Sequence, residues 1–115
     1  MRMKKLILCA PLLAACLLAF AGPPVYPGAK PVDALNEASK KAGRPNVLAY
    51  NTFDSFEKVY EFYKTKGVER VHNVNAQEKF AMIVFKESGY TVAIGWHEDS
   101  KESGTVIHIS KGGGQ

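Results

Sequence analysis

The sequence predicts an α+β fold, in which a mostly antiparallel sheet of about four strands packs against one or two helices after an N-terminal signal peptide. Two observations lead to this fold. Residues 54–66 repeat apolar side chains with the 3.6-residue period of an amphipathic helix, and from Phe80 onward short apolar runs alternate with turn residues, as strands do. The helix and the sheet each have an apolar side that must be buried against another element.

Residues 1–21 are predicted to be a signal peptide. Arg2, Lys4 and Lys5 form a basic start, residues 6–18 are apolar, and Ala19-Phe20-Ala21 has the small-x-small form of a cleavage site. The apolar run is too short for a stable membrane span. We therefore expect export to a bacterial periplasm, or secretion.

A second interpretation of this segment stays open. Leu13-Ala14-Ala15-Cys16 has the form of a lipobox, in which Cys16 would be lipidated and would anchor the protein to the envelope. Residues 17–20 are apolar where a polar tether is usual, which favours cleavage after Ala21. A membrane is an expected partner only if Cys16 carries a lipid.

Charge and cysteine content exclude two classes of function. The chain has 15 basic and 11 acidic residues, and because three of the basic residues lie in the leader, its net charge falls from +4 to +1 when the leader is removed. No basic patch for nucleic acid remains. Both cysteines, Cys9 and Cys16, also lie in the leader, so the mature domain has no disulfide or thiol chemistry. No cofactor is expected.

The rest of the chain divides simply. Residues 22–31 form a proline-rich arm with a turn at Tyr26-Pro27-Gly28-Ala29, residues 32–111 form a single α+β domain, and residues 112–115 form a flexible tail. Residues 32–43 are expected to be helical, with a narrow apolar stripe of Leu35, Ala38 and Ala42.

The main helix is predicted over residues 54–66. We expect Asp54 to cap its first turn, Glu57 to reach back toward that cap, and Gly67 to end the helix in a left-handed conformation. Its buried stripe consists of four residues at i, i+3, i+4 and i+7: Phe56, Val59, Tyr60 and Tyr63.

Four strands are predicted, over residues 46–51, 80–85, 90–97 and 105–110, with residues 68–76 as a loop or a short edge strand. If Phe85 pairs with Tyr90 and Ile94 with Ile107, one face of the sheet gathers the residues that the main helix covers: Ala81, Ile83, Val92, Ile94, Ile107 and Ile109. The same register places Trp96 opposite Thr105.

The other face of the sheet is too apolar to be left fully exposed in a monomer. It would hold Phe80, Met82, Val84, Thr91, Ala93, Gly95, Val106, His108 and Ser110. Three elements could cover it, namely the helix over residues 32–42, the proline-rich arm or a second molecule.

No catalytic or metal-binding set emerges from the residue pattern. His97 and His108 would lie more than ~10 Å apart on neighbouring strands, too far for a shared metal ion. The serines lack a nucleophile elbow, and the glycines of the tail lack a strand-to-helix context. We therefore expect a non-catalytic accessory or binding domain.

The candidate binding site is an apolar face formed by Phe62, Phe80, Met82, Val106 and His108. Its expected partner is an unidentified protein or a small apolar ligand, and a homodimer is an alternative. Two other functions stay open: a small periplasmic enzyme that uses His97 or His108 with a loop carboxylate, and an inhibitor that presents residues 98–104 to a secreted enzyme.

Three segments resemble a loose group of small exported bacterial proteins of unassigned function. These segments are Tyr26-Pro27-Gly28-Ala29-Lys30, the stretch from Tyr50 to Val59, and Phe62-Tyr63-Lys64. The resemblance implies an exported protein with a Tyr-Pro-Gly-Ala arm, a Phe-Tyr-Lys helix and a β-meander. It implies no catalytic residue.

Overall fold

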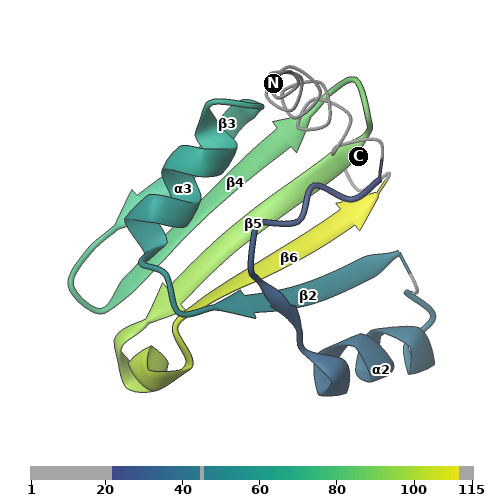
Figure 1. The fold of residues 1–115 in the computed structure, drawn as a ribbon, viewed down its shortest axis with the longest axis horizontal. Helices are drawn as coiled ribbons and strands as arrows, with labels where there is room; N and C mark the ends of the chain where they lie inside the picture. The colour runs from purple at the N-terminus through teal and green to yellow at the C-terminus, as the bar shows by residue number, and fades with distance from the viewer. Residues whose placement is uncertain (1–21, 45, 112–115) are drawn as a thin grey trace, which may run out of the picture.

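The computed structural model describes residues 22–44 and 46–111, so the predicted signal peptide, Cys16 and the tail over residues 112–115 lie outside the described part. The fold is α+β (Figure 1), with one six-stranded antiparallel sheet in the order β1-β2-β6-β5-β4-β3. The strands are β1 (Lys30–Pro31), β2 (Val47–Thr52), β3 (Val68–Val74), β4 (Glu78–Phe85), β5 (Tyr90–His97) and β6 (Thr105–Lys111). The helices are α2 (Asp33–Lys41), α3 (Phe56–Lys64) and the 3₁₀ segment η3 (Glu98–Ser103).

The expected number of about four strands is too low, because the edge strand β1 was missed and β3 was predicted only as a loop or a short edge strand. β1 is a two-residue pairing at the end of the proline-rich arm, where Lys30 lies opposite Asn51. β3 pairs with β4 from Lys79 to Val84, although six of its seven residues are exposed and its register shifts between Glu69 and Val71. Edge strands of this kind lack the alternating apolar pattern that identifies central strands.

The central register is confirmed. Phe85 pairs with Tyr90 across the β4–β5 turn, and Ile94 pairs with both Ala81 and Ile107. The β5–β6 ladder ends at Gly95 and Val106, one pair before the expected pairing of Trp96 with Thr105. Turn geometry fixes the first hairpin, because Gly89 has a φ of 80° and its N–H bonds to the Phe85 carbonyl at 2.8 Å.

α3 covers one face of the sheet, which we call the inner face. Its predicted stripe of Phe56, Val59, Tyr60 and Tyr63 is fully confirmed as the buried side of the helix. These side chains join the isoleucines and valines of β4, β5 and β6 in a single core. Most of the hydrophobic stabilisation of the fold therefore lies between α3 and three strands.

Three predicted helix signals were wrong. Ser55, not Asp54, is the N-cap, and its side chain accepts a hydrogen bond from the Lys58 N–H at 3.2 Å. Glu57 does not reach back to the cap but pairs with Lys79 at 2.8 Å. Gly67 is not among the glycines of positive φ; a Cβ there would lie 2.7 Å from the Ile83 side chain, so the residue is needed for close packing instead.

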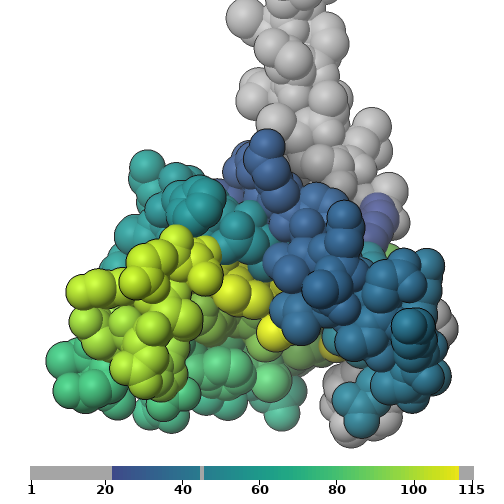
Figure 2. All heavy atoms as spheres, turned by 90° about the horizontal axis from the view of Figure 1, so that it is seen from below, coloured from purple at the N-terminus to yellow at the C-terminus, as the bar shows by residue number. Residues whose placement is uncertain are grey.

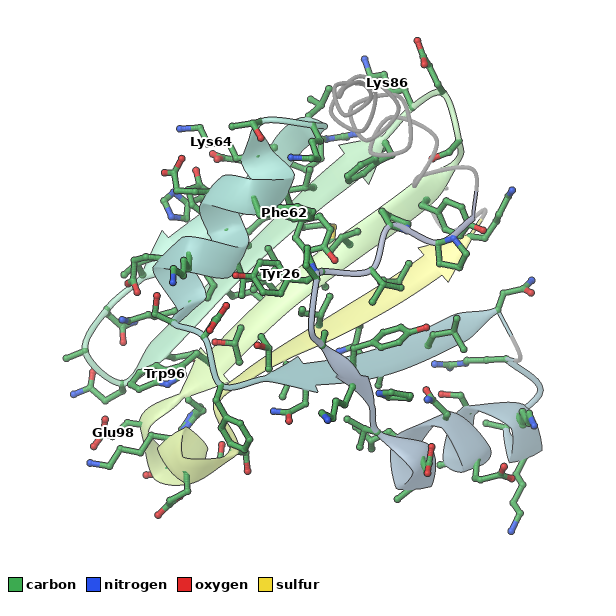
Figure 3. The ribbon with its side chains drawn as sticks, viewed as in Figure 1. Tyr26, Phe62, Lys64, Lys86, Trp96 and Glu98 are labelled. Carbon is green, nitrogen blue, oxygen red and sulfur yellow. The ribbon has the colours of Figure 1, made fainter. Side chains whose placement is uncertain are left out.

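Asp54 instead anchors the proline-rich arm, which packs on the inner face beside α3 (Figure 3). The Tyr26 hydroxyl donates to Asp54 Oδ2 at 2.6 Å, and the Tyr63 hydroxyl donates to the Pro24 carbonyl at 2.5 Å. The predicted turn after Tyr26 is present, with Ala29 N–H bonded to the Tyr26 carbonyl at 3.0 Å and Gly28 at a φ of 85°. The arm is part of the core and not a separate extension.

α2 forms where predicted but does not cover the second face of the sheet. It lies beside β2 (Figure 1), and its expected stripe of Leu35, Ala38 and Ala42 is exposed. The helix is held through Asn36, whose side chain accepts from the Ala49 N–H at 2.6 Å and donates to the Ala49 carbonyl at 3.4 Å. Asn36 thereby occupies the hydrogen-bonding groups that an added strand would use, and the β2 edge is closed.

Candidate functional site

The face of the sheet opposite α3 is the candidate site, and we call it the outer face. Cross-strand pairing arranges it in three rows across β2, β6, β5, β4 and β3. The rows are Val47–Ser110–Thr91–Val84–Val68, Ala49–His108–Ala93–Met82–Val71 and Asn51–Val106–Gly95–Phe80–Asn73. None of these fifteen positions holds Asp, Glu, Lys or Arg. Among the described residues, both α3 and the arm lie on the inner face.

On the outer face, a strand with small side chains lies next to a strand with large side chains. β5 contributes the small side chains Thr91, Ala93 and Gly95, which we call the trough. β4 contributes Val84, Met82 and Phe80, which we call the ridge, and each ridge residue lies directly opposite one trough residue. A hollow of about 210 Å³ opens over Gly95. Its lining includes the apolar residues Phe80 and Val106 and the polar or charged residues Glu78, Lys79, His97 and Ser100. A Cβ at Gly95 would meet no atom within 4 Å.

A larger groove of about 580 Å³ lies at one end of the outer face. Its apolar lining comes from Pro31, Val32, Leu35, Phe53 and Val106, and its polar rim from Lys30, Asn51, Glu102 and Ser103. Seen from below in Figure 2, atoms of β6 are visible between η3 and the segment that contains β1 and α2. Phe53 is 79% exposed and Leu35 is 43% exposed, so large apolar side chains line an open groove.

The Asn51 side chain connects β2 to the chain segment at the end of η3, which lines one side of this groove. Its side-chain amide donates to the carbonyl of Ser103, the last residue of η3, and to the Thr105 carbonyl at 3.5 Å. Gly104 turns the chain here with a φ of 76°, and a Cβ at that position would lie 2.4 Å from the Thr52 carbonyl oxygen. The groove is therefore bounded by a tightly connected corner of the structure.

His108 is the one titratable side chain in the three rows. Partial burial lowers its pKa, because desolvation disfavours the charged imidazolium. Its cross-strand neighbours are Ala49 and Ala93, and its neighbours along β6 on this face are Val106 and Ser110. None of these four neighbours carries a carboxylate.

The structure divides the predicted binding face between the two sides of the sheet. Phe80, Met82, Val106 and His108 lie together on the outer face. Phe62 lies on α3 over the inner face (Figure 3), where its ring contacts Tyr26 at a centroid distance of 5.1 Å and an interplanar angle of 83°. Grouping Phe62 with the other four residues was wrong, because the helix that carries it packs on the opposite side.

His97 does not join His108 in a site. Its Nδ1 accepts from the Asp99 N–H at 3.2 Å and lies 3.7 Å from Asp99 Oδ2, so its nearest carboxylate belongs to its own exposed turn. Residues 22–44 and 46–111 contain no group of three or more His, Cys, Asp or Glu side chains able to hold a metal ion. The predicted charged loop over residues 98–104 is the short 3₁₀ segment η3, fixed by the Lys101–Glu98 pair at 3.1 Å.

Three tyrosines of the inner face also have perturbed pKa values, and the pKa of Glu57 is lowered by its hydrogen bond with Lys79. The pKa of Tyr26 is raised to about 12 by burial and by its hydrogen bond to Asp54. The pKa of Tyr60 is raised to about 12 by its hydrogen bond to Glu69, and its ring stacks on His72 at 4.2 Å. Burial raises the pKa of Tyr63. Each hydroxyl is already occupied as a donor, so these groups serve packing.

Sequence reasoning missed the groove residues Leu35, Phe53 and Asn51. The sequence pattern placed Leu35 in the narrow apolar stripe of the helix over residues 32–43 and did not single out Phe53. One signal was available: Asn51 and Phe53 follow Val47 and Ala49 with a period of two, so extending that alternation places Phe53 at the end of the outer face.

Comparison with known proteins found no matching family model, no similar curated protein and no similar solved structure. Among the described residues, none of the helices is long and apolar enough to cross a membrane.

Proposed function

We propose that the protein is an exported, non-catalytic binding domain, located in the periplasm or secreted, that takes an apolar ligand in the groove beside Phe53. The ligand is a small apolar molecule or an apolar side chain of a partner protein. The observation that carries this proposal is the exposure of Phe53 and Leu35 over a groove of about 580 Å³. Small-molecule sites have volumes of about 300–1,000 Å³ and mostly apolar linings.

The composition of the groove supports an apolar ligand with few polar contacts. Lys30 and Glu102 carry opposite charges at the rim, and the side-chain amide of Asn51 already donates to two backbone carbonyls. Lys30 and Glu102 lie at the rim, and the lining between them is mostly apolar. Binding then depends on buried apolar area, at about 25 cal/mol per Å².

A fluorescent probe of apolar surface tests the groove. Replacing Phe53 by Ser removes an exposed ring, so the melting temperature should change little while the fluorescence of bound anilinonaphthalene sulfonate falls several-fold. Val74→Ser is the matched control, because Val74 is also exposed but lies on β3, outside the groove. Equal dye binding by wild type and both variants would contradict the proposed site.

The export part of the proposal has its own test. Intact mass of the protein purified from the envelope should equal that of a chain beginning at Gly22. A mass that instead corresponds to a diacylglycerol group on Cys16 would establish the lipid-anchored alternative. The mass of the uncut chain would contradict both.

A further inference from the structure

We propose that the outer face is the interface of a two-fold symmetric dimer, in which the ridge of each copy packs into the trough of the other. The symmetry axis runs parallel to the strands, between β4 and β5. Phe80 of one copy then lies in the hollow over Gly95 of the other. This proposal is independent of the ligand groove and goes beyond it.

The register makes the outer face complementary to itself. A 180° rotation about an axis parallel to the strands places β4 of one copy over β5 of the other. Each residue keeps its position along the strand direction. The partner's Phe80 therefore lies over Gly95, the partner's Met82 over Ala93, and the partner's Val84 over Thr91, since these residues are cross-strand pairs within one chain. Large side chains meet small ones at all three levels, as close packing requires.

One feature of the trough is left open in a single chain. Space remains over Gly95, although its cross-strand neighbours Phe80 and Val106 are large. The partner's Phe80 would fill this space, as close packing requires. The Thr91 hydroxyl oxygen, in contrast, is already enclosed within the chain and has no hydrogen-bond partner among the described residues.

The charge pattern favours a second copy over a charged partner. In an isologous interface residue i of one copy contacts residue j of the other and j contacts i, so a charge on this face would be buried in both copies at once. None of the fifteen positions in the three rows is Asp, Glu, Lys or Arg. Charge begins at the end of the ridge, where Glu78 lies on the same face as Phe80 and pairs with His97, and it continues on η3, α2 and the β4–β5 turn. The face can therefore meet itself without like-charge repulsion.

The available area is enough for a dimer of moderate affinity. With this axis, strands β3, β4, β5 and β6 of one copy overlap the same four strands of the other. The overlapping patch is roughly 19 Å wide and 25 Å long at usual strand spacings. The flat area is roughly 950 Å² for both copies, and side-chain relief raises it toward the lower end of the 1,200–2,000 Å² of stable complexes. β2 and α2 lie outside the overlap, which leaves most of the groove accessible.

Sedimentation velocity over roughly 1–100 µM tests the interface, since its size suggests a micromolar Kd. The sample is the protein as purified from the expressing cells, and the mass of one chain is measured separately by mass spectrometry. We expect wild type to double its mass as the concentration rises. Gly95→Val should stay monomeric, because its side chain fills the hollow that the partner's Phe80 needs.

Gly95→Val also separates the interface from the fold. Gly95 does not have a positive φ, and an added Cβ meets nothing within 4 Å, so a β-branched residue should keep or raise the melting temperature of the monomer. Met82→Lys is the second disruptive variant, and Phe53→Ser, in the groove, is the control that should dimerise normally. A wild type that remains monomeric at every concentration, or a dimer that either disruptive variant leaves intact, would overturn the proposal.

Discussion

The two faces of the sheet carry similar apolar content but differ in what covers them. The inner face is covered by α3 and the arm, and its isoleucines and valines are fully buried. The outer face has the trough, the ridge and the groove, and the described residues place no helix over it. Hydrophobic patterning therefore identifies a surface that needs to be buried, but it does not indicate whether the same chain or another molecule buries it. Changes on the inner face should cost stability, and changes on the outer face should cost binding.

The largest expected effect is at Tyr63, at the centre of the inner face. Tyr63→Ala should lower the free energy of unfolding by about 3–5 kcal/mol, because it leaves a cavity beneath α3. Tyr63→Phe should cost about 1–3 kcal/mol, since the Pro24 carbonyl loses its donor. Urea unfolding measures both. A loss as large for the exposed Phe53→Ala as for Tyr63→Ala would remove the distinction between the faces.

An intermediate effect should appear in alkaline solution. The pKa values of Tyr26 and Tyr60 are raised from 10.0 to about 12, so the folded state holds protons that the unfolded state releases. Stability should be intact below pH 10 and should fall as the pH rises toward 12. Unfolding free energies measured from pH 9 to 12 check this sign. Tyr26→Phe should reduce the slope, and an unchanged slope would show that the arm hydroxyl does not contribute.

The smallest effect should come from His108 on the outer face. Its pKa is lowered by desolvation, so the folded state favours the neutral imidazole. Stability should be fully present above pH 6.5 and should decrease as the pH falls toward 5. The same protonation would place a charge within the proposed interface and weaken the dimer. His108→Gln should remove both dependences and His97→Gln neither; equal slopes for the two variants would contradict this assignment.

The sequence predicted the parts of the fold that depend on local periodicity. The α3 stripe and the β4–β5–β6 register follow from spacing and from turn residues such as Gly89, and both are confirmed. The strand β1 and the anchoring of α2 through Asn36 could not be predicted, because each depends on one non-local contact with β2. Asp54 and Ser55 are both good caps by residue type; in the structure Ser55 caps the helix, and Asp54 accepts a hydrogen bond from the distant Tyr26.

The candidate site was predictable only in part, for the same reason. Alternation along β4, β5 and β6 placed Phe80, Met82, Val106 and His108 on one face. Phe62 was misassigned because its position off the helical stripe gave no information on the arm that contacts it. The groove brings Leu35 and Phe53 beside Val106 from three separate elements, and no pattern within one segment encodes such a meeting.

The most direct test compares two adjacent residues of β4 that point to opposite faces. Ile83→Ala and Met82→Ala are measured by urea unfolding at a protein concentration well below the dimer Kd, and by sedimentation well above it. We expect Ile83→Ala to lower the unfolding free energy by about 2–5 kcal/mol, whereas Met82→Ala costs less than about 1 kcal/mol and weakens the dimer severalfold. If Met82→Ala destabilises the monomer as much as Ile83→Ala and leaves self-association unchanged, the outer face is structural and the account is wrong.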